Sequence, residues 1–526
     1  MPSIICEKEM NKILSTIHLM VLCAVVGLTA CKGTAKDEPE LTPQQQQEDT
    51  VPARQEAVSP STRTEQYRPQ VHYTPHHNWS NDPNGLFYKD GVWHLYYQFN
   101  PNGIGCDFGG MSWGHASSTD LMHWQEKSPV LYPDAMGAMY SGCSVVDHDN
   151  KAGFGNGAVL AYYTASGEKQ VICLAVSTDG GETFWKYDRN PIVPSTGLVN
   201  FRDPKVVYDA KRGRWTMLVA RGWDLGAEIW HSYNLMQWDF DGIFRVNIER
   251  CNMSQWECCD LMYFDQADKW VAVVSINPNG YITGSSTMYF VGSFDGVTFT
   301  PDEEDYPRWL DYGADCYAGV TFDNAPDGRK VMTAWMNNWD YAPLCPPQAW
   351  KGAYTLPREL SLRRIGDRWV LCSEPVKELN VLAGAWQQAA TAMENIGGDY
   401  ADAWEAQITL SLTQDASVTL YNKYGNRYVI RVDADRRILY CDRGGNTGEF
   451  NFSTLFAVPS MSAPIEGNNP YLTLDIVVDQ SSVELFADEG STCVTNTVYP
   501  RTIYRNISVD GDVKDLKVRT LETIWK

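Results

Sequence analysis

The chain has 526 residues, of which 44% are hydrophobic and 12% aromatic, and its formal net charge is −22. Because a single core stops growing at roughly 250–300 residues, this length predicts two domains. The strong negative charge argues against nucleic acid or an anionic membrane surface as a partner, and it is compatible with a neutral substrate.

The first 31 residues resemble a bacterial lipoprotein signal. A basic region begins at Met10-Asn11-Lys12, an apolar stretch covers residues 13–28, and Thr29-Ala30 directly precede Cys31. The apolar stretch is too short and too close to the start to be a convincing membrane-spanning helix. We therefore expect a signal peptide over residues 1–31, cleaved before Cys31, and lipidation of Cys31. The alternative is an ordinary signal peptide with a cysteine there by chance.

Residues 32–66 are rich in Pro, Gln, Glu and Thr and contain almost no apolar residue. Such a segment cannot bury a core, so it predicts a disordered tether. A lipid anchor followed by a tether places the protein outside the cytoplasm. The cell surface or outer membrane is the favoured location, and the periplasmic face is the alternative.

An aromatic element repeats through the next region, residues 67–372. A Ser-Thr-Asp or similar turn leads to an aromatic residue four times, at Trp124, Trp185, Trp238 and Phe299. Four-stranded units that repeat every 50–60 residues or so are typical of a β-propeller. The region has room for five blades, and a long β-sandwich is the structural alternative. A parallel-sheet enzyme is disfavoured because the crossover helices are missing.

The remaining residues, 385–526, alternate apolar and polar side chains along short strands, as in ASVTLYNKYGNRYVIRVD. This pattern predicts hairpins of a C-terminal β-sandwich. The segment has no cluster of acids and aromatic residues, so we interpret it as a supporting module. The fold class predicted for the whole chain is all-β.

One acidic residue opens a strand in each of three predicted blades: Asp82 in NDPNG, Asp203 in FRDP and Glu257 in WECCD. Any one of these could be a solvated turn, and NDPNG alone reads as the entry to a hairpin. The same register in three repeats favours a site where the blades converge on the propeller axis.

Together with these acids, further short segments resemble glycoside hydrolase family 32, the family of invertases, inulinases and levanases. The similarity covers about residues 70–520 and includes the segments Tyr97–Pro101, Trp113–Ala116, Tyr140–Gly142, Asp311–Gly313 and Leu356–Leu360. The resemblance implies a five-bladed propeller followed by a β-sandwich.

The resemblance also implies the chemistry of the three acids. Asp82 is expected to be the nucleophile, Glu257 the acid/base and Asp203 the group that stabilises the transition state, with Arg202 orienting Asp203. Retaining glycoside hydrolysis uses such a pair of carboxyl groups. This mechanism needs no cofactor.

The predicted substrate-binding residues are Asn81, Gln98, Phe108, Tyr140, Ser141, Arg202 and Trp335. Three positions depart from the family pattern. Cys259 stands where the family usually has Pro, Phe108 stands where a Trp is usual, and Ser80 replaces a bulkier apolar residue. Phe108 and Ser80 are expected at the rim of the pocket, where they bear on substrate preference rather than reaction type.

Several neighbouring residues admit plainer interpretations. Trp113 and His115 either belong to the pocket or pack beneath it, and Arg358 with Glu359 is expected to be a structural ion pair. No metal site is predicted, although the spacing of His72, His76 and His77 loosely resembles that of metal ligands. The eleven cysteines after Cys31 include no C-x-x-C pair, so neither a zinc site nor a full disulfide framework follows.

The leading hypothesis is a hydrolase of levan- or inulin-type fructan, with exo attack slightly favoured over endo attack. A sucrose-cleaving invertase or a fructosyltransferase is the alternative within enzymes. From another class, a catalytically silent lipoprotein that binds fructan at the cell surface is disfavoured because all three acids are present. The expected partners are a fructan or fructo-oligosaccharide and a lipid anchor; the sequence leaves linkage preference and oligomeric state open.

Overall fold

The computed structural model describes residues 63–302, 307–398, 402–444, 452–458 and 460–525. These belong to the unit Thr50–Lys526, one of two into which the chain divides. The predicted signal peptide, Cys31 and residues 32–62 of the predicted tether lie outside the described residues. In the described part no helix is long and apolar enough to cross a membrane.

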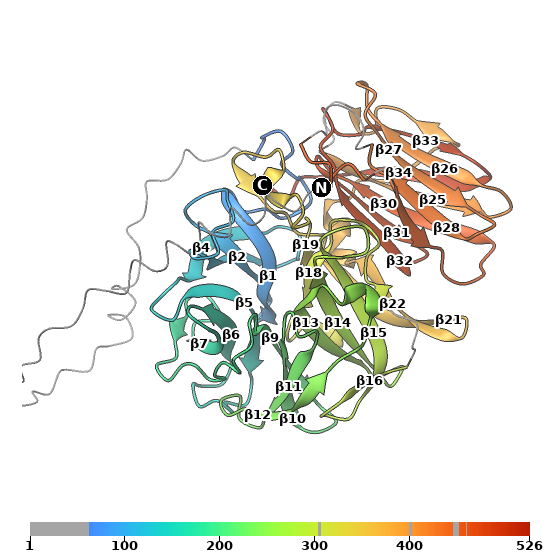
Figure 1. Ribbon diagram of the computed structural model, residues 1–526. Coiled ribbons are helices and arrows are strands. Elements are labelled where there is room, and N and C mark those ends of the chain that lie inside the picture. Colours follow the sequence, from blue (N-terminus) through green and yellow to red (C-terminus); the bar gives the residue numbers. More distant parts are fainter. Residues whose placement is uncertain (1–62, 303–306, 399–401, 445–451, 459, 526) are drawn as a thin grey trace, which may run out of the picture. The chain divides into compact units, whose positions relative to one another are not determined.

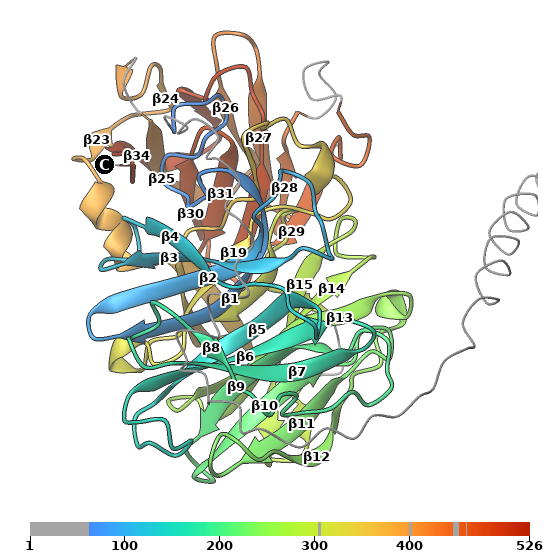
Figure 2. The same ribbon diagram turned by 90° about the vertical axis from the view of Figure 1, so that its left-hand side faces the viewer.

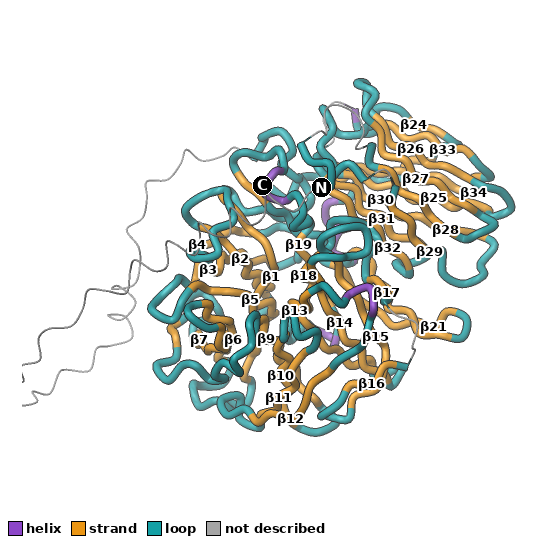
Figure 3. Tube along the Cα trace, viewed as in Figure 1, coloured by secondary structure: helices purple, strands orange, loops and turns teal. Residues whose placement is uncertain are grey.

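Strands dominate the described part of the chain (Figure 3). Helical structure there is limited to short 3-10 turns: η1 (Glu249–Cys251), η2 (Pro326–Gly328), η3 (Ala342–Leu344) and η4 (Lys377–Leu382). The all-β prediction is therefore confirmed.

Residues 78–375 form five sheets, antiparallel except for one short pair, which we call the N-terminal sheets. The first, in spatial order, is β20 (Trp350–Lys351), β1 (Asn78–Lys89), β2 (Val92–Asn100), β3 (Ser112–Ser118) and β4 (Gln125–Leu131), in which β20 pairs parallel to β1. The second is β5 (Ala138–Asp147), β6 (Ala158–Ser166), β7 (Gln170–Ser177) and β8 (Trp185–Lys186). The third is β9 (Arg202–Asp209), β10 (Arg214–Ala220), β11 (Ala227–Ser232) and β12 (Asp239–Phe244). The fourth is β13 (Gln255–Phe264), β14 (Lys269–Asn277) and β15 (Ser286–Phe294), with β16 (Phe299–Pro301) and β17 (Arg308–Trp309) both on β15. The fifth is β18 (Tyr317–Thr321), β19 (Val331–Trp335), β21 (Arg358–Ile365) and β22 (Arg368–Pro375).

The strand that comes first in the chain in each of these five sheets contacts its counterparts in two other sheets. β1 contacts β5, β5 contacts β9, β9 contacts β13, β13 contacts β18, and β18 contacts β1. Figure 1 shows these strands gathered at the centre of the N-terminal sheets, with the later strands of each sheet outside them. The ring brings residues that are far apart in sequence to one axis.

Every strand of this ring has a break in its regular pairing. The register shifts at Asn81-Asp82 in β1, at Ser141 in β5, at Asp203-Pro204 in β9, at Cys258-Cys259 in β13 and at Ala318-Gly319 in β18. A β-bulge leaves extra residues out of the ladder and re-aims their side chains, and bulges are common beside active sites. The acids singled out in the sequence therefore lie at or next to bulges.

Residues 387–521 form two six-stranded sheets, the C-terminal sheets, which lie face to face (Figures 1 and 2). One is β23 (Gln387–Gln388), β34 (Val513–Leu521), β25 (Ala403–Ser411), β30 (Tyr471–Val478), β31 (Ser482–Ala487) and β32 (Thr492–Thr497). The other is β24 (Ala392–Met393), β33 (Asn506–Asp510), β26 (Ala416–Tyr421), β27 (Arg427–Asp433), β28 (Ile438–Asp442) and β29 (Met461–Pro464). Their alternating apolar residues, such as Ile408, Val418 and Leu474, are fully buried between them, as the period-2 pattern predicts.

A buried network of charged residues joins the two sets of sheets. We call it the interface network: His72, Asp311, Arg358, Asp479 and Glu484. Arg358 Nη1 lies 2.9 Å from Asp311 and Nη2 lies 2.7 Å from Glu484, while His72 lies 2.7 Å from Asp479 and 2.9 Å from Glu484.

The interface network corrects one prediction. Arg358 does not pair with Glu359, which instead pairs with Arg329 at 2.8 Å. Successive residues of a strand point to opposite faces, so the side chains of these two neighbours diverge. His72 also lies in this network and not with His76 and His77, whose ring centroids are 4.4 Å apart with the rings tilted by 33°.

Candidate active site

The three acids line one cavity of about 370 Å³ at the bulges of the inner strands. Its walls are formed by Asn81, Asp82, Gln98, Phe108, Tyr140, Ser141, Gln170, Asn200, Arg202, Asp203, Gln255, Glu257, Asn277 and Trp339. Carboxylates from three different sheets thus converge on one space, which the repeat pattern alone had suggested.

Asp82 is fixed by three donors. Ser141 Oγ donates to its Oδ2 at 2.8 Å, Asn81 Nδ2 donates to its Oδ1 at 3.1 Å, and the Cys258 thiol lies 3.6 Å from Oδ2. Burial raises the pKa of Asp82, and the nearby charge of Glu257 raises it further, while these three donors oppose the shift. The carboxylate is held in one orientation with little freedom to rotate.

Asp203 sits in a left-handed backbone conformation with φ of 61°. Its own N–H donates to Thr164 Oγ1 at 3.0 Å, and its Oδ2 accepts the Cys258 N–H at 3.0 Å. A non-glycine residue in this conformation is strained and is often found at functional sites. Burial raises the pKa of Asp203 to about 7, and Glu257 and Asp82 add to the rise while Arg202 opposes it.

Both oxygens of Glu257 have a protein donor. Arg202 Nε and Nη2 both donate to Oε1, the former at 3.2 Å, and the Tyr317 hydroxyl donates to Oε2. Arg202 Nε lies farther from Asp203, at 3.8 Å. Its hydrogen bonds go to Glu257, Gln170 and Gln255, whereas with Asp203 it forms only this longer ion pair. That Arg202 orients Asp203 stays a prediction.

Cys258 lies between two of the acids. Its Sγ is 3.6 Å from Asp82 Oδ2 and 3.7 Å from Asp203 Oδ2, and its backbone φ is 45°. Burial raises the pKa of this thiol well above its ordinary value, and the surrounding carboxylates add to the effect. The thiol therefore stays protonated and can donate weakly to both acids.

The cavity has two chemically different sides. The aromatic side is Phe108, Tyr140 and Trp339, with Phe108 6.2 Å from Tyr140 and 5.8 Å from Trp339 between ring centroids. The amide side is formed by Gln170, Asn200, Gln255 and Asn277, which adjoin Arg202 and Glu257. Aromatic faces suit the apolar faces of a sugar, and amides suit its hydroxyl groups.

Six of the seven predicted substrate-binding residues line the cavity; Trp335 is the exception. Trp335 is fully buried and packs against Trp79, Tyr317 and Trp339, so it lies behind the wall. Trp339, four residues later, takes the place expected for it. The rim prediction also changes: Phe108 is 53% exposed, but Ser80 is fully buried and so cannot shape the rim.

The four amide residues and Trp339 were missed from the sequence. One signal was available for Gln255, because it lies two residues before Glu257 on β13 and residues two apart share a face of a strand. Asn200, Gln170 and Asn277 lie in a loop or at a strand end, where no periodic pattern marks them.

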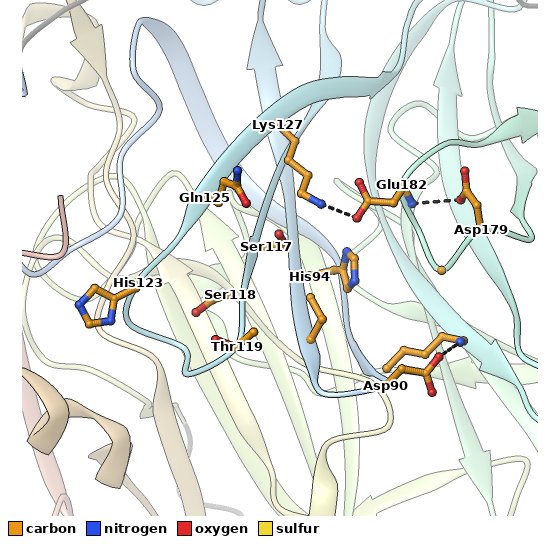
Figure 4. A pocket seen from close by; sticks show the side chains of 13 residues that line it. Asp90, His94, Ser117, Ser118, Thr119, His123, Gln125, Lys127, Asp179 and Glu182 are labelled. Carbon is orange, nitrogen blue, oxygen red and sulfur yellow. Dashed lines mark hydrogen bonds and ion pairs between the residues drawn. The ribbon is translucent and has the colours of Figure 1, made fainter. Parts of the chain in front are cut away.

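A second cavity, of about 460 Å³, has a different character (Figure 4). His94 points into it beside the ion pair of Lys127 with Glu182. Its acid Asp90 is paired with Lys89, and Asp179 accepts hydrogen bonds from Ser177 and Thr183 within its own turn. This cavity lacks a converging pair of acids and is not the candidate active site.

Trp113 and His115 lie between these two cavities and belong to the packing interpretation. Both are fully buried. Trp113 Nε1 donates to the Tyr140 carbonyl at 3.0 Å, and His115 Nε2 lies 3.0 Å from His94 Nδ1. Within the described residues no group of three or more His, Cys, Asp and Glu side chains could hold a metal ion.

Comparison with known proteins places the chain in a family. Residues 72–375 match the glycosyl hydrolases family 32 N-terminal domain, and residues 380–524 match the family 32 C-terminal domain. The chain is 36% identical to a levanase of Bacillus subtilis over 500 residues, covering 89% of this chain and 72% of the relative. It is 33% identical to an extracellular exo-inulinase of Meyerozyma guilliermondii over 504 residues, covering 86% of this chain and 96% of the relative.

Solved structures agree with the sequence comparison. An exo-inulinase from Aspergillus awamori superposes with a TM-score of 0.80 at 27% identity, covering 88% of this chain and all of that one. A fructofuranosidase from Schwanniomyces occidentalis complexed with fructosylnystose gives a TM-score of 0.79 at 28% identity, with 89% and 99% covered. The chain therefore belongs to glycosyl hydrolase family 32 and is a glycosidase.

Proposed function

We propose that this chain is a retaining glycoside hydrolase that cleaves the β-fructofuranosidic bonds of levan- or inulin-type fructans. The observation that carries the proposal is the convergence of Asp82, Asp203 and Glu257, from three sheets, on one cavity. Retaining cleavage needs one carboxylate to attack the anomeric carbon and a second carboxyl group to move the proton.

In the first step Asp82 attacks the anomeric carbon of a fructosyl unit while Glu257 gives its proton to the departing oxygen. Ser141 and Asn81 hold the attacking carboxylate, which limits the reorientation needed at the moment of attack. Once Glu257 has lost its proton, Arg202 and Tyr317 stabilise the carboxylate that forms.

In the second step Glu257 takes a proton from water, and the hydroxide formed releases fructose from Asp82. Asp203 accepts hydrogen bonds from ring hydroxyls and stabilises the positive charge that develops in both transition states. The Cys258 N–H keeps one oxygen of Asp203 fixed toward the cavity.

The relatives named levanase and exo-inulinase support a fructan as the substrate. Exo attack is slightly favoured, because a cavity of about 370 Å³ accepts a chain end more readily than the middle of a chain. Sucrose cleavage, fructosyl transfer and silent fructan binding remain the competing functions.

Parallel incubation with levan, inulin and sucrose tests this function. We expect release of fructose from a fructan at a higher kcat/KM than from sucrose. Early-time chromatography separates the modes, since exo attack gives fructose alone and endo attack gives a ladder of oligosaccharides. Binding of fructan without any product, or cleavage of sucrose alone, would contradict the proposal.

We also propose a domain layout: a lipoprotein signal peptide over residues 1–31, a tether over 32–66, a five-bladed propeller over 67–372 and a β-sandwich over 385–526. The ring of β1, β5, β9, β13 and β18 supports five blades, each N-terminal sheet being one blade. The two facing six-stranded sheets support the sandwich.

The lipid anchor and a location outside the cytoplasm, at the cell surface or outer membrane, belong to this proposal. They rest on the sequence before and after Cys31. A Cys31→Ser variant should leave the detergent phase or accumulate as uncleaved precursor, because the thioether to lipid cannot form. Unchanged partition into detergent would reject lipidation at this residue.

A further inference from the structure

Three exposed apolar side chains stand on neighbouring loops beside the amide side of the cavity. We call them the loop rim: Val199, Trp223 and Met253, with exposed fractions of 74%, 51% and 75%. They lie in the loops that precede β9, β11 and β13. Single exposed apolar residues are ordinary, but several on loops that contact one another beside a cavity suggest a binding surface.

Contacts between the loops place the rim at the cavity. Asn200, next to Val199, donates to Gln255 Oε1 at 2.8 Å, and both line the cavity. Gly222, next to Trp223, accepts the Trp256 N–H at 3.0 Å. A Cβ on Gly222, whose φ is +48°, would come within 2.5 Å of Asn200 Cβ, so glycine allows these loops to touch.

The loop that carries Trp223 is rigid and electrically balanced. Arg221 Nε donates to Asp224 Oδ2 at 2.6 Å, and the Asp224 N–H donates to the Arg221 carbonyl at 3.0 Å. Arg245 also pairs with Asp224, and Arg221 pairs with Glu228, so two arginines face two acids. The loop therefore holds Trp223 at the tip of a closed turn. The charges around it balance, which suits a neutral ligand better than a charged one.

The position of Glu257 fixes which part of a substrate would reach the loop rim. The acid must face the departing oxygen, so the leaving group lies on the side of Glu257 and Gln255. Asn200 and Arg202 both donate to Gln255 Oε1, which leaves the amide NH₂ as the group that can bind a sugar hydroxyl. A chain that continues beyond this first sugar passes toward the loop rim.

We propose that the loop rim binds the second and later fructosyl units on the leaving side of a fructan chain, with Trp223 stacking on a sugar face. This inference rests on the proposed function and names its substrate class more closely: a polymer with several units after the scissile bond. The leaving group of sucrose is a single sugar, which reaches the amide side but not the rim. The rim would therefore raise selectivity for fructans over sucrose.

The test compares kcat/KM on sucrose, on fructo-oligosaccharides of increasing length, and on levan and inulin. For Trp223→Ala we expect a fall of about tenfold on chains with at least two leaving-side units, equivalent to about 1.4 kcal/mol of transition-state binding. The fall on sucrose should stay below threefold. Trp223→Tyr should recover most of the loss because it keeps a stacking face.

Phe240→Ala is the matched control, because Phe240 is also 51% exposed but lies on β12, outside the residues that line the cavity. It should change neither ratio. Met253→Ser should reduce activity on long chains by a smaller factor than Trp223→Ala.

The inference would be overturned by no loss with Trp223→Ala on any fructan, or by an equal loss on sucrose and fructan that Trp223→Tyr does not recover. Loss of a dimer in Trp223→Ala, seen by sedimentation, with unchanged fructan kinetics would assign the rim to a second copy of the chain and also overturn it. Failure of the wild-type chain to cleave any fructoside would instead reject the proposed function.

Discussion

The candidate active site and the interface network both bury several acids, but they compensate the charge differently. In the interface network Arg358 and His72 face three carboxylates, and although burial alone would raise the pKa of Glu484, Arg358 and His72 lower it to about 2. In the site, Arg202 pairs with Asp203 and Glu257, yet burial and the neighbouring acids still raise the pKa of Asp203 to about 7. The ion pairs of the interface network hold the two sets of sheets together, whereas the acids of the candidate active site are arranged for reaction.

The difference has a thermodynamic meaning. Carboxylates with a lowered pKa favour the folded state near neutral pH, whereas carboxylates with a raised pKa oppose it. Strained backbone at Asp203 and Cys258 adds to the second effect. The molecule thus combines a reactive centre that lowers stability with a buried network whose pairing resists separation of the two sets of sheets.

The largest expected effect is the loss of activity when one acid of the candidate active site is removed. Asp82→Asn and Glu257→Gln should each lower kcat by about three orders of magnitude or more, because each removes a group from the covalent cycle. Thermal unfolding should show the fold intact. Glu182→Gln, an acid of the second cavity, is the control and should keep wild-type kcat. Retention of a tenth of the activity in either site variant would contradict the assigned roles.

Removing the cation of the interface network should have the opposite result: lower stability with little change in activity. Arg358→Met leaves Asp311 and Glu484 buried without their partner, so we expect a loss of about 3–5 kcal/mol in the free energy of unfolding. Activity per folded molecule should change little. Arg368→Met, whose side chain is 44% exposed and pairs with Glu466, should lose less than about 1 kcal/mol. Equal losses in the two variants would show that burial of the pair does not matter.

His72 makes the stability of the interface network depend on pH. Burial lowers the pKa of His72, but hydrogen bonds with Asp479 and Glu484 outweigh it and raise the pKa to about 9. Since this is above the unfolded value of about 6.5, the contribution is fully present below pH 6.5 and is lost as pH rises toward 9. His72→Gln should therefore destabilise by about 1–3 kcal/mol at pH 6 and by much less above pH 9.

Denaturant unfolding across this pH range measures the effect. The control is His123→Gln at the partly exposed pair with Asp120, where the difference from wild type should vary less with pH. A difference for His72→Gln that does not change between pH 6 and pH 9.5 would reject the charged state of His72 in the folded protein.

The smallest effect should be a gain in stability. The raised pKa of Asp203 means that its contribution to folding is present below the unfolded value of about 3.8 and is lost as pH rises through about 7. Asp203→Asn removes the buried charge, so it should stabilise by about 1–2 kcal/mol at pH 8 and by less at pH 4.5, while activity falls. Calorimetry at both pH values checks this. Lower stability of Asp203→Asn at pH 8 would mean that the contacts of the Asp203 carboxylate outweigh the cost of burying its charge.

Motifs predicted the convergence of the acids better than they predicted their partners. Asp82, Asp203 and Glu257 could be found because each was predicted to open a strand at the same point of a repeat, although in the structure each lies inside its strand, past the first residue. The hydrogen bonds from Arg202 to Glu257 could not be predicted, because the bulge at Asp203-Pro204 turns the neighbouring side chains in a way that the sequence does not reveal. Ion-pair partners also depend on which sheets pack together, which is why the Arg358–Glu359 prediction was wrong.

The exchange of Trp335 for Trp339 has its cause outside the segment that contains them. Trp335 ends β19, and the Asn338 side-chain oxygen then accepts the Ser285 N–H at 3.2 Å and the Asp340 N–H at 3.1 Å. These bonds fold the segment back so that the second tryptophan reaches the cavity. A contact with a distant loop decides the outcome, and no pattern within the segment contains it.

The bulge at Cys258-Cys259 limits how this strand can vary among related sequences. Two residues there oppose one residue of β14, so Glu257 faces the cavity while Asp260, farther along, lies 3.2 Å from Lys205 inside the sheet packing. Deleting one residue would turn the strand beyond it to the opposite face. Substitution is a smaller change, because residue 259 lies outside the regular ladder, and there a cysteine replaces the usual proline. Insertions and deletions should therefore be excluded from this segment, whereas a substitution at residue 259 should be tolerated.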